Sequence, residues 1–309
     1  MLLLLSPGVA MAQQAPTVED GFALLRAGKP DDARNVFEAV LGGKPDDSQA
    51  QSGEVQASEG VALAQYHDGH RVEALQALLR ARPFAPRSPR LLVDLGILEE
   101  EMKLYPNAEK DLGLAQQVSP NDLNADYAMA RVKMDEGQLD AAGENMKAYL
   151  KARPDDASAH YGMGRIDELG MQFDQARAEF LRSIAIQPVQ TEAYYELGDV
   201  DLKQDNYTEA LSYFQKVLAR NGQHAGALAD AGQALYREKQ YTAALPYLQR
   251  AVVVAPAYQP GHYYLGLTLS RLGRKEESNR ELLTAQKLAD EDNRNAGRTY
   301  QISPAPASQ

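Results

Sequence analysis

The sequence predicts an all-α protein, a right-handed α-solenoid of helix–turn–helix units. Three residue ladders, each with a step of 34 positions, predict it. The first ladder consists of helix-terminating residues: Pro86, Pro120, Pro154, Pro188, Gly222 and Pro256. The second consists of small residues: Ala62, Gly96, Ala130, Gly164, Gly198, Gly232 and Gly266. The third is a further small-residue ladder: Ala74, Ala108, Ala142, Ala176, Ala210, Ala244 and Ser278. A shared register over seven units argues against coincidence.

Each ladder has a physical reason. Proline after a helix stops it, because the ring removes the N–H and disfavours helix at the preceding residue. Glycine or alanine at a helix crossing lets two backbones approach, where a bulky side chain would overpack the contact. Four residues after each rung of the third ladder the residue is large: Leu78, Leu112, Met146, Phe180, Phe214, Leu248 and Leu282. One such helical pair cannot bury its apolar stripe alone, so neighbouring pairs must stack.

This 34-residue pattern resembles the tetratricopeptide repeat (TPR) family, which implies a scaffold that holds other proteins. Thr191–Gly222 shows it most clearly, with Leu197-Gly198, then Ala210 and Phe214. Eight units fill residues 14–292: Gln14–Asp47, Val55–Ser88, Pro89–Asp122, Leu123–Asp156, Ala157–Gln190, Thr191–His224, Ala225–Tyr258 and Gln259–Asp292. Two features depart from the family: no unit has Trp at the first-helix anchor, and the first unit matches weakly.

The ladder slips once, between the first two units. The extra residues lie around Ser48–Glu54, and seven residues are close to two helical turns of about 3.6 residues each. Such an insertion can lengthen a helix without rotating its apolar face. The sequence therefore predicts one long helix from about Ser48 to Tyr66.

Both ends of the chain lie outside the repeats. Residues 1–12 resemble the second half of a secretory signal peptide, with an apolar run at Leu2–Leu5 and an Ala-x-Ala site that predicts cleavage after Ala12. The basic segment that normally precedes such a run is missing, and a short disordered or core-facing N-terminus is the alternative. Export would make the protein periplasmic or secreted. Residues 293–309 are polar and contain proline, and they predict a disordered tail.

Composition narrows the classes of partner. The net charge of −11 argues against nucleic acid, because its binders need a basic face. The chain has no cysteine, which removes disulfides, thiol catalysis and a lipid anchor on cysteine. No apolar run reaches the roughly 18 residues that a membrane span needs.

The sequence offers no catalytic, cofactor-binding or metal site. His67 and His70 flank a predicted turn with no third ligand near them, whereas a zinc site normally uses three or four protein ligands. Gly162-Met163-Gly164 imitates the start of a dinucleotide motif but lies inside a predicted helix with no strand before it. We therefore expect a protein that is not an enzyme and uses no cofactor.

One periodic feature is a candidate binding site. The family resemblance implies that the fifth position of each first helix faces a concave groove, and Arg or Asp follows one turn later on the same face. The candidate groove residues are Tyr127, Arg131, Tyr161, Arg165, Tyr195, Asp199 and Tyr263. Tyr and Arg are favoured at binding hot spots, but tyrosine at this slot can equally serve packing between units. The carboxylate clamp that some family members use is missing from these positions.

The sequence thus predicts a non-enzymatic scaffold that binds a peptide segment of a partner protein in this groove, in a bacterial envelope assembly. Two alternatives stay open. The chain could self-associate as a structural protein, or it could be an accessory arm of a polysaccharide or secretion system whose catalysis belongs to another polypeptide.

Overall fold

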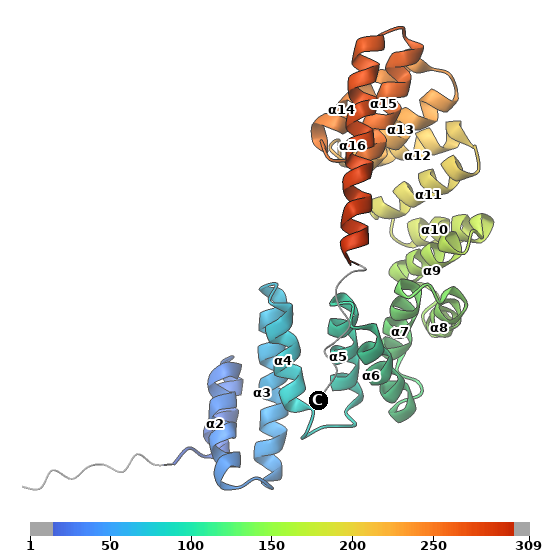
Figure 1. The fold of residues 1–309 in the computed structure, drawn as a ribbon. Coiled ribbons are helices and arrows are strands. Elements are labelled where there is room, and N and C mark those ends of the chain that lie inside the picture. Colours follow the sequence, from blue (N-terminus) through green and yellow to red (C-terminus); the bar gives the residue numbers. More distant parts are fainter. Residues whose placement is uncertain (1–14, 300–309) are drawn as a thin grey trace, which may run out of the picture. The chain divides into compact units, whose positions relative to one another are not determined.

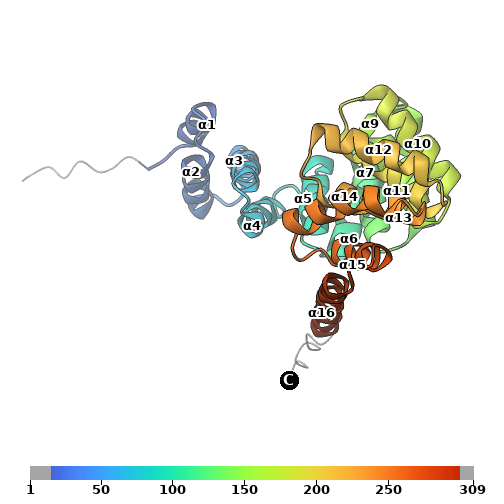
Figure 2. The ribbon, with the colours of Figure 1, turned by 90° about the horizontal axis from the view of Figure 1, so that it is seen from above.

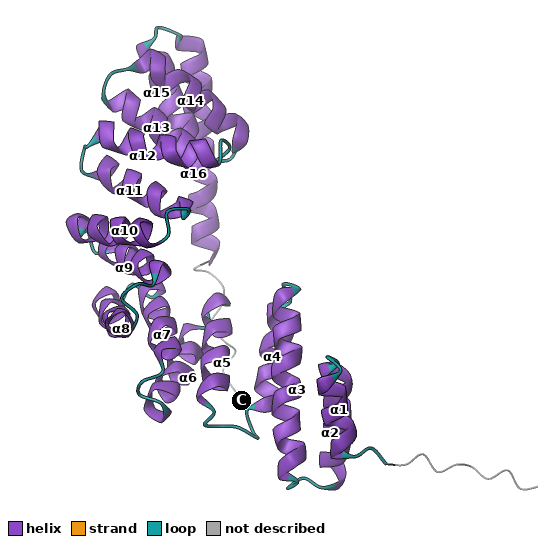
Figure 3. Cartoon of the chain, turned by 180° about the vertical axis from the view of Figure 1, so that it is seen from behind, coloured by secondary structure: helices purple, strands orange, loops and turns teal. Residues whose placement is uncertain are grey.

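The computed structural model describes residues 15–299, with side chains described through Asp292. Every regular element in this range is an α-helix, and successive helices form antiparallel pairs joined by short turns (Figures 1 and 3). The chain divides into two compact units, Met1–Ala152 and Arg153–Gln309. The all-α solenoid of helix pairs that the sequence predicts is confirmed.

Within the described residues, the N-terminal unit contains four helix pairs, of which α1 with α2 and α3 with α4 are seen along their axes in Figure 2. Its helices are α1 (Val18–Arg26), α2 (Pro30–Gly43), α3 (Ser48–His67), α4 (Arg71–Ala81), α5 (Pro89–Glu101), α6 (Tyr105–Val118), α7 (Leu123–Asp135) and α8 (Leu139–Ala152). The described part of the C-terminal unit, residues 153–299, contains four more pairs. Its helices are α9 (Ala157–Leu169), α10 (Phe173–Ile186), α11 (Thr191–Lys203), α12 (Tyr207–Arg220), α13 (Ala225–Arg237), α14 (Tyr241–Val254), α15 (Gln259–Arg271) and α16 (Lys275–Thr299).

The small-residue ladder makes room for a side chain of the partner helix. A Cβ added to Gly198 in α11 would lie 2.5 Å from Cε1 of Phe214 in α12, and one added to Gly164 would lie 2.7 Å from Cδ1 of Phe180. Both phenylalanines are fully buried. Glycine is therefore needed at these positions of the first helix, because the phenylalanine ring of the second helix occupies the space that a Cβ atom would take.

The lengthened helix is confirmed: α3 has 20 residues where α5, α7 and α9 have 13 each. The inserted turns contain Gly53, and a Cβ there would lie 2.2 Å from Phe37 of α2. Gly21 of α1 lies against the same ring from another helix. The insertion thus gives Phe37 a second glycine to pack against, and that ring is fully buried.

The turn inside every pair contains one residue in the left-handed region, always at the fifteenth position of the repeat. Their φ values lie between 58° and 82°: Gly28, Gly69, Lys103, Gly137, Met171, Asp205, Lys239 and Gly273. Glycine adopts this conformation freely at Gly137, whereas Met171 adopts it at a cost of about 1–2 kcal/mol. The packing of the two helices therefore imposes the turn even where the residue type resists it.

Two histidines replace the family's aromatic anchor and connect the helices of their pairs. His160 Nδ1 lies 2.6 Å from Glu179 Oε2 of α10, and its Nε2 lies 2.9 Å from the carbonyl oxygen of Pro154. His262 repeats both contacts with Glu281 and Pro256. In both pairs the imidazole links the two helices to the turn before them.

The two terminal segments predicted from sequence have different outcomes. The signal-peptide segment 1–12 lies outside the described residues. Disorder is predicted from 293 onward, but α16 continues to Thr299, and residues 300–309 lie outside the described range. An existing helix extends at little cost in free energy, because each added residue gains one backbone hydrogen bond without a new nucleation step. The first proline after α16 begins comes only at Pro304, so no proline ends the helix before that point.

Candidate interaction surface

In the C-terminal unit the candidate residues lie on the first helix of each pair. Tyr161 and Arg165 are one turn apart on α9, and Tyr195 and Asp199 are one turn apart on α11. Residues four apart share one face of a helix. The first helices therefore present these side chains on one side of the helix stack. In either unit, we call the surface that the first helices form at these repeat positions the first-helix face.

The two tyrosines tie neighbouring first helices together. The Tyr161 hydroxyl donates a hydrogen bond to Glu196 of α11 (3.1 Å), and the Tyr195 hydroxyl donates one to Asp230 of α13 (2.7 Å). Their rings also lie against the buried phenylalanines of their own pairs, with centroids 5.8 Å and 5.9 Å from Phe180 and Phe214. Both side chains are half-buried, so these two tyrosines serve packing between repeats.

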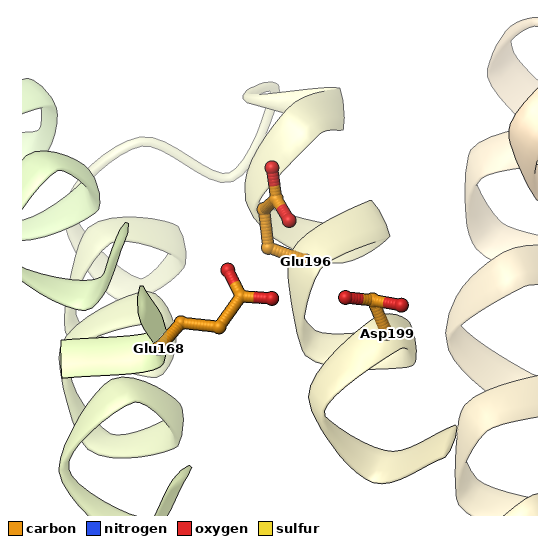
Figure 4. Close-up of side chains that lie close together, drawn as sticks. All are labelled: Glu168, Glu196 and Asp199. Carbon is orange, nitrogen blue, oxygen red and sulfur yellow. The ribbon is translucent and has the colours of Figure 1, made fainter. Parts of the chain in front are cut away.

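Three carboxylates meet between α9 and α11. Figure 4 shows Glu168 on one helix and Glu196 and Asp199 on the next. One oxygen atom of each carboxylate lies within 4.8 Å of one oxygen atom of each of the other two. Glu168 and Glu196 are buried. Two cations compensate this charge. Arg165 bonds Glu196 and lies 3.6 Å from Glu168, and Lys203 Nζ lies 2.6 Å from both Glu168 and Asp199.

Such a carboxylate group could in principle hold a metal ion. Here the Lys203 ammonium already takes the place between Glu168 and Asp199 that a cation would occupy. A metal would have to displace this ammonium. We therefore assign no metal to this group, and treat it as an ion-pair network that joins two repeats.

Burial shifts the pKa of Glu168 in this network and of Asp230 on the adjacent first helix α13. Burial raises the pKa of Glu168 to about 7, against the lowering effect of its hydrogen bond with Lys203. Burial likewise raises the pKa of Asp230 to about 7, although the hydrogen bond from Tyr195 lowers it. Burial and the negative charge of Asp230 raise the pKa of the Tyr195 hydroxyl. Glu168 and Asp230 therefore take up protons as the pH falls through about 7, whereas the raised pKa of Tyr195 keeps that phenol protonated at neutral pH.

The N-terminal unit has the same kind of contact at its candidate residues. Arg131 of α7 forms an ion pair with Glu100 of α5 at 2.7 Å. The Tyr127 ring lies 5.1 Å from the Tyr149 ring, between centroids. Arg131 therefore resembles Arg165, because both are paired with a buried glutamate of a neighbouring first helix.

Tyr263 of α15 differs from the other tyrosines in the C-terminal unit. Its side chain is 42% exposed, and its ring lies 5.2 Å from that of Tyr264. Among the candidate residues of this unit, it is the tyrosine that the structure leaves most open for a partner.

Sequence reasoning missed the partners of the candidate residues. Four residues that are not among the predicted site residues complete the contacts described above: Glu100, Glu196, Asp230 and Lys203. A signal did exist, because an acidic residue follows both Tyr161 and Tyr195 by 35 positions, which is one repeat plus one residue. That spacing places it on the next first helix.

The Tyr195–Asp230 bond leads to a first testable expectation. Tyr195→Phe should lower the free energy of unfolding by about 1–3 kcal/mol, because buried Asp230 loses its donor. Urea unfolding followed by circular dichroism measures this. Tyr263→Phe is the matched control and should stay within about 0.5 kcal/mol of the wild type, since its side chain is exposed. Equal stability of Tyr195→Phe and wild type would contradict a structural role for the hydroxyl.

Comparison with known families identifies the repeat. The family model described as tetratricopeptide repeat matches residues 21–89, 127–191, 169–225 and 195–262, which together make up more than half of the chain. The chain belongs to the tetratricopeptide repeat family. TPR folds are generally non-catalytic scaffolds for protein–protein interaction, and they bind protein or peptide partners. A search of curated proteins gives no match.

Solved TPR-type structures share the fold at low sequence identity. A tetratricopeptide repeat protein from Parabacteroides merdae is 15% identical, with 82% of this chain and 97% of that chain covered and a TM-score of 0.58. The pilF protein of Pseudomonas aeruginosa is 18% identical, with 65% of this chain and 91% of that chain covered and a TM-score of 0.58. A chain of the APC/C hetero-tetramer Cut9–Hcn1 is 16% identical, with 86% of this chain and 52% of that chain covered and a TM-score of 0.62. These likenesses concern the fold alone.

The described helices also bear on membrane insertion. None of the helices within residues 15–299 is both long enough and apolar enough to cross a bilayer.

Proposed function

We propose that this TPR protein is a non-enzymatic scaffold that binds a peptide segment of a partner protein on its first-helix face, in an assembly of the bacterial envelope. The partner is a protein and not a nucleic acid, in keeping with the net charge of −11. The scaffold works without a cofactor.

The observation that carries this proposal is the polar network between α9 and α11. Its inner atoms are fixed by contacts to the neighbouring helix, while the Arg165 and Lys203 side chains stay 36% and 44% exposed. A surface whose side chains are already held in place loses little conformational entropy when it binds. Arginine is also enriched among residues that dominate binding energy.

Export is the second part of the proposal. The apolar run at Leu2–Leu5 and the Ala-x-Ala site before Gln13 support removal of a leader after Ala12. The mature protein then acts in the periplasm or outside the cell. N-terminal sequencing of the protein recovered from a periplasmic extract tests this, and an intact Met1 in that fraction contradicts it.

Photo-crosslinking in cells tests the binding surface. Tyr161 and Tyr195 are poor positions for the crosslinker, because both are half-buried and hydrogen-bonded. Leu169 lies on the same stripe of α9 as Tyr161 and is 49% exposed, and Tyr263 is 42% exposed on α15. A photoreactive amino acid at either position should capture one discrete protein.

Glu209 on α12 is the matched control, because it is exposed on a second helix. The proposal expects no capture of the same protein from Glu209. Equal capture from all three positions, or capture of this chain alone, would overturn binding on the first-helix face.

A further inference from the structure

A hollow of about 340 Å³ opens on the first-helix face of the N-terminal unit, where α3 and α5 form its walls. Its apolar lining comes from Leu63 and Tyr66 of α3 and from Ile97 and Leu98 of α5, with Leu78 of α4. Leu63 is 59% exposed. The hollow is therefore an accessible apolar recess above a closed core.

The repeat register explains why this recess is open. Leu63 and Ile97 occupy the same repeat position as Arg131, Arg165 and Asp199, in steps of 34 residues. Arg131 and Arg165 each form an ion pair with a glutamate of a neighbouring first helix, and Asp199 forms one with Lys203 of its own helix. Leu63 and Ile97 are apolar and make no such bridge, so the space between α3 and α5 is left for another apolar group.

The rim of the hollow carries two carboxylates and one cation. Arg90 Nε lies 3.8 Å from Glu59 and 3.9 Å from Asp94, and the Arg90 side chain is 76% exposed. Burial raises the pKa of Glu59 and of Asp94 even though Arg90 lowers both. One loosely held arginine thus compensates two half-buried carboxylates incompletely.

The other polar groups near the hollow are already engaged. The Tyr66 hydroxyl donates to Glu101 at 2.6 Å, and the Arg71 guanidinium lies 3.9 Å above the Tyr66 ring. A small polar ligand would find few free donors to orient it. The volume is also at the lower end of the about 300–1,000 Å³ typical of small-molecule pockets. A protein side chain with an adjacent positive charge fits these properties better.

We propose that this hollow binds a large apolar side chain of a partner protein, one helical turn away from a lysine or arginine that bonds Glu59 and Asp94. The apolar group covers Leu63 and Ile97, and the cation supplies the missing positive charge at the rim. This site lies in the N-terminal unit and goes beyond the proposed binding on α9 and α11.

Fluorescence anisotropy with designed peptides tests the proposal on the full chain. The probe is a labelled alanine-rich helical peptide with a central leucine and a lysine four positions later. Two control peptides replace the leucine by alanine or the lysine by glutamate. We expect the leucine–lysine peptide to bind at least tenfold more tightly than either control. Equal affinity of the three peptides would overturn the proposal.

Protein variants locate the binding. Leu63→Gln should weaken the leucine–lysine peptide at least tenfold, while circular dichroism confirms the fold of this variant at an exposed position. Glu59→Gln combined with Asp94→Asn should remove the preference for lysine over glutamate but keep the preference for leucine over alanine. Leu181→Gln, at an exposed leucine on the second helix α10 of the C-terminal unit, should leave the affinity for the leucine–lysine peptide unchanged.

Two further outcomes would assign the hollow a different role. Loss of peptide binding in Leu169→Gln but not in Leu63→Gln would place the peptide on the C-terminal unit and overturn the proposal. A concentration-dependent mass in sedimentation that Leu63→Gln abolishes would also overturn it, because the hollow would then hold a second copy of the chain. Failure here leaves the crosslinking result at Leu169 and Tyr263 unaffected, so the two proposals fail separately.

Discussion

Phe214→Ala is expected to lower the free energy of unfolding by about 3–5 kcal/mol, the usual cost of removing a buried phenylalanine. Phe214 is fully buried between α11 and α12, and its ring fills the space above Gly198. In a repeat protein each unit contacts only its neighbours, so the loss should be local. Hydrogen exchange should show reduced protection in α11–α13, and urea unfolding gives the magnitude. Glu209→Ala on α12 is the control and should stay within about 0.5 kcal/mol.

The same site allows a sharper test of why glycine is required. Gly198→Ala alone should cost about 1–3 kcal/mol, because the new methyl group overlaps the Phe214 ring. The chain already contains alanine opposite leucine, at Ala62 and Leu78. Gly198→Ala combined with Phe214→Leu should therefore cost less than the sum of the two single changes. Additivity within about 0.5 kcal/mol would show that the two residues do not compete for this space.

The second large effect concerns pH. Among the residues whose side chains are described, burial raises the pKa of four carboxyl groups to about 7: Glu54, Glu99, Glu168 and Asp230. A raised folded-state pKa means that the folded protein binds the proton more tightly than the unfolded chain does. Stability is then highest below the unfolded pKa of about 4.5 for glutamate and falls as the pH rises through about 7.

Glu54 is the best group for the measurement, because it is 2% exposed and its Oε2 atom has no hydrogen-bond partner among the described residues. Between pH 5.5 and pH 8 it should contribute up to about 2 kcal/mol of lost stability. Glu54→Gln should reduce the pH dependence by that amount and be more stable relative to wild type at pH 8 than at pH 5.5. Identical pH dependence of the two proteins, measured by urea unfolding, would contradict the raised pKa.

The sequence is enough to predict the architecture because its constraints are local and periodic. The repeated Gly198 and Phe214 positions indicate where the two helices of a pair touch, and the prolines indicate where the second helix ends. The long α3 follows from an insertion of nearly two turns. The turn at Met171 is harder to predict, because its left-handed conformation is imposed by the packing of the flanking helices and not by the residue type.

The candidate surface is predicted only in part. Tyr161, Arg165, Tyr195 and Asp199 do lie on the first-helix face, but their partners come from the adjacent repeat. Whether Tyr195 is free to bind depends on Asp230, 35 residues later, and the role of Asp199 depends on the Lys203 ammonium that it shares with Glu168. Such contacts depend on the spacing and rotation between stacked helices, which the repeat period alone does not specify.

The central claim is that the first-helix face binds the partner. The most direct measurement uses the partner protein that is captured by photo-crosslinking from Leu169 or Tyr263. Titration calorimetry at fixed salt then gives the affinity of that partner for two matched charge variants of this chain. Arg165→Gln on α9 should weaken binding at least tenfold, and Glu209→Gln on α12 should change it less than twofold. Wild-type affinity of a folded Arg165→Gln variant would contradict binding on this face.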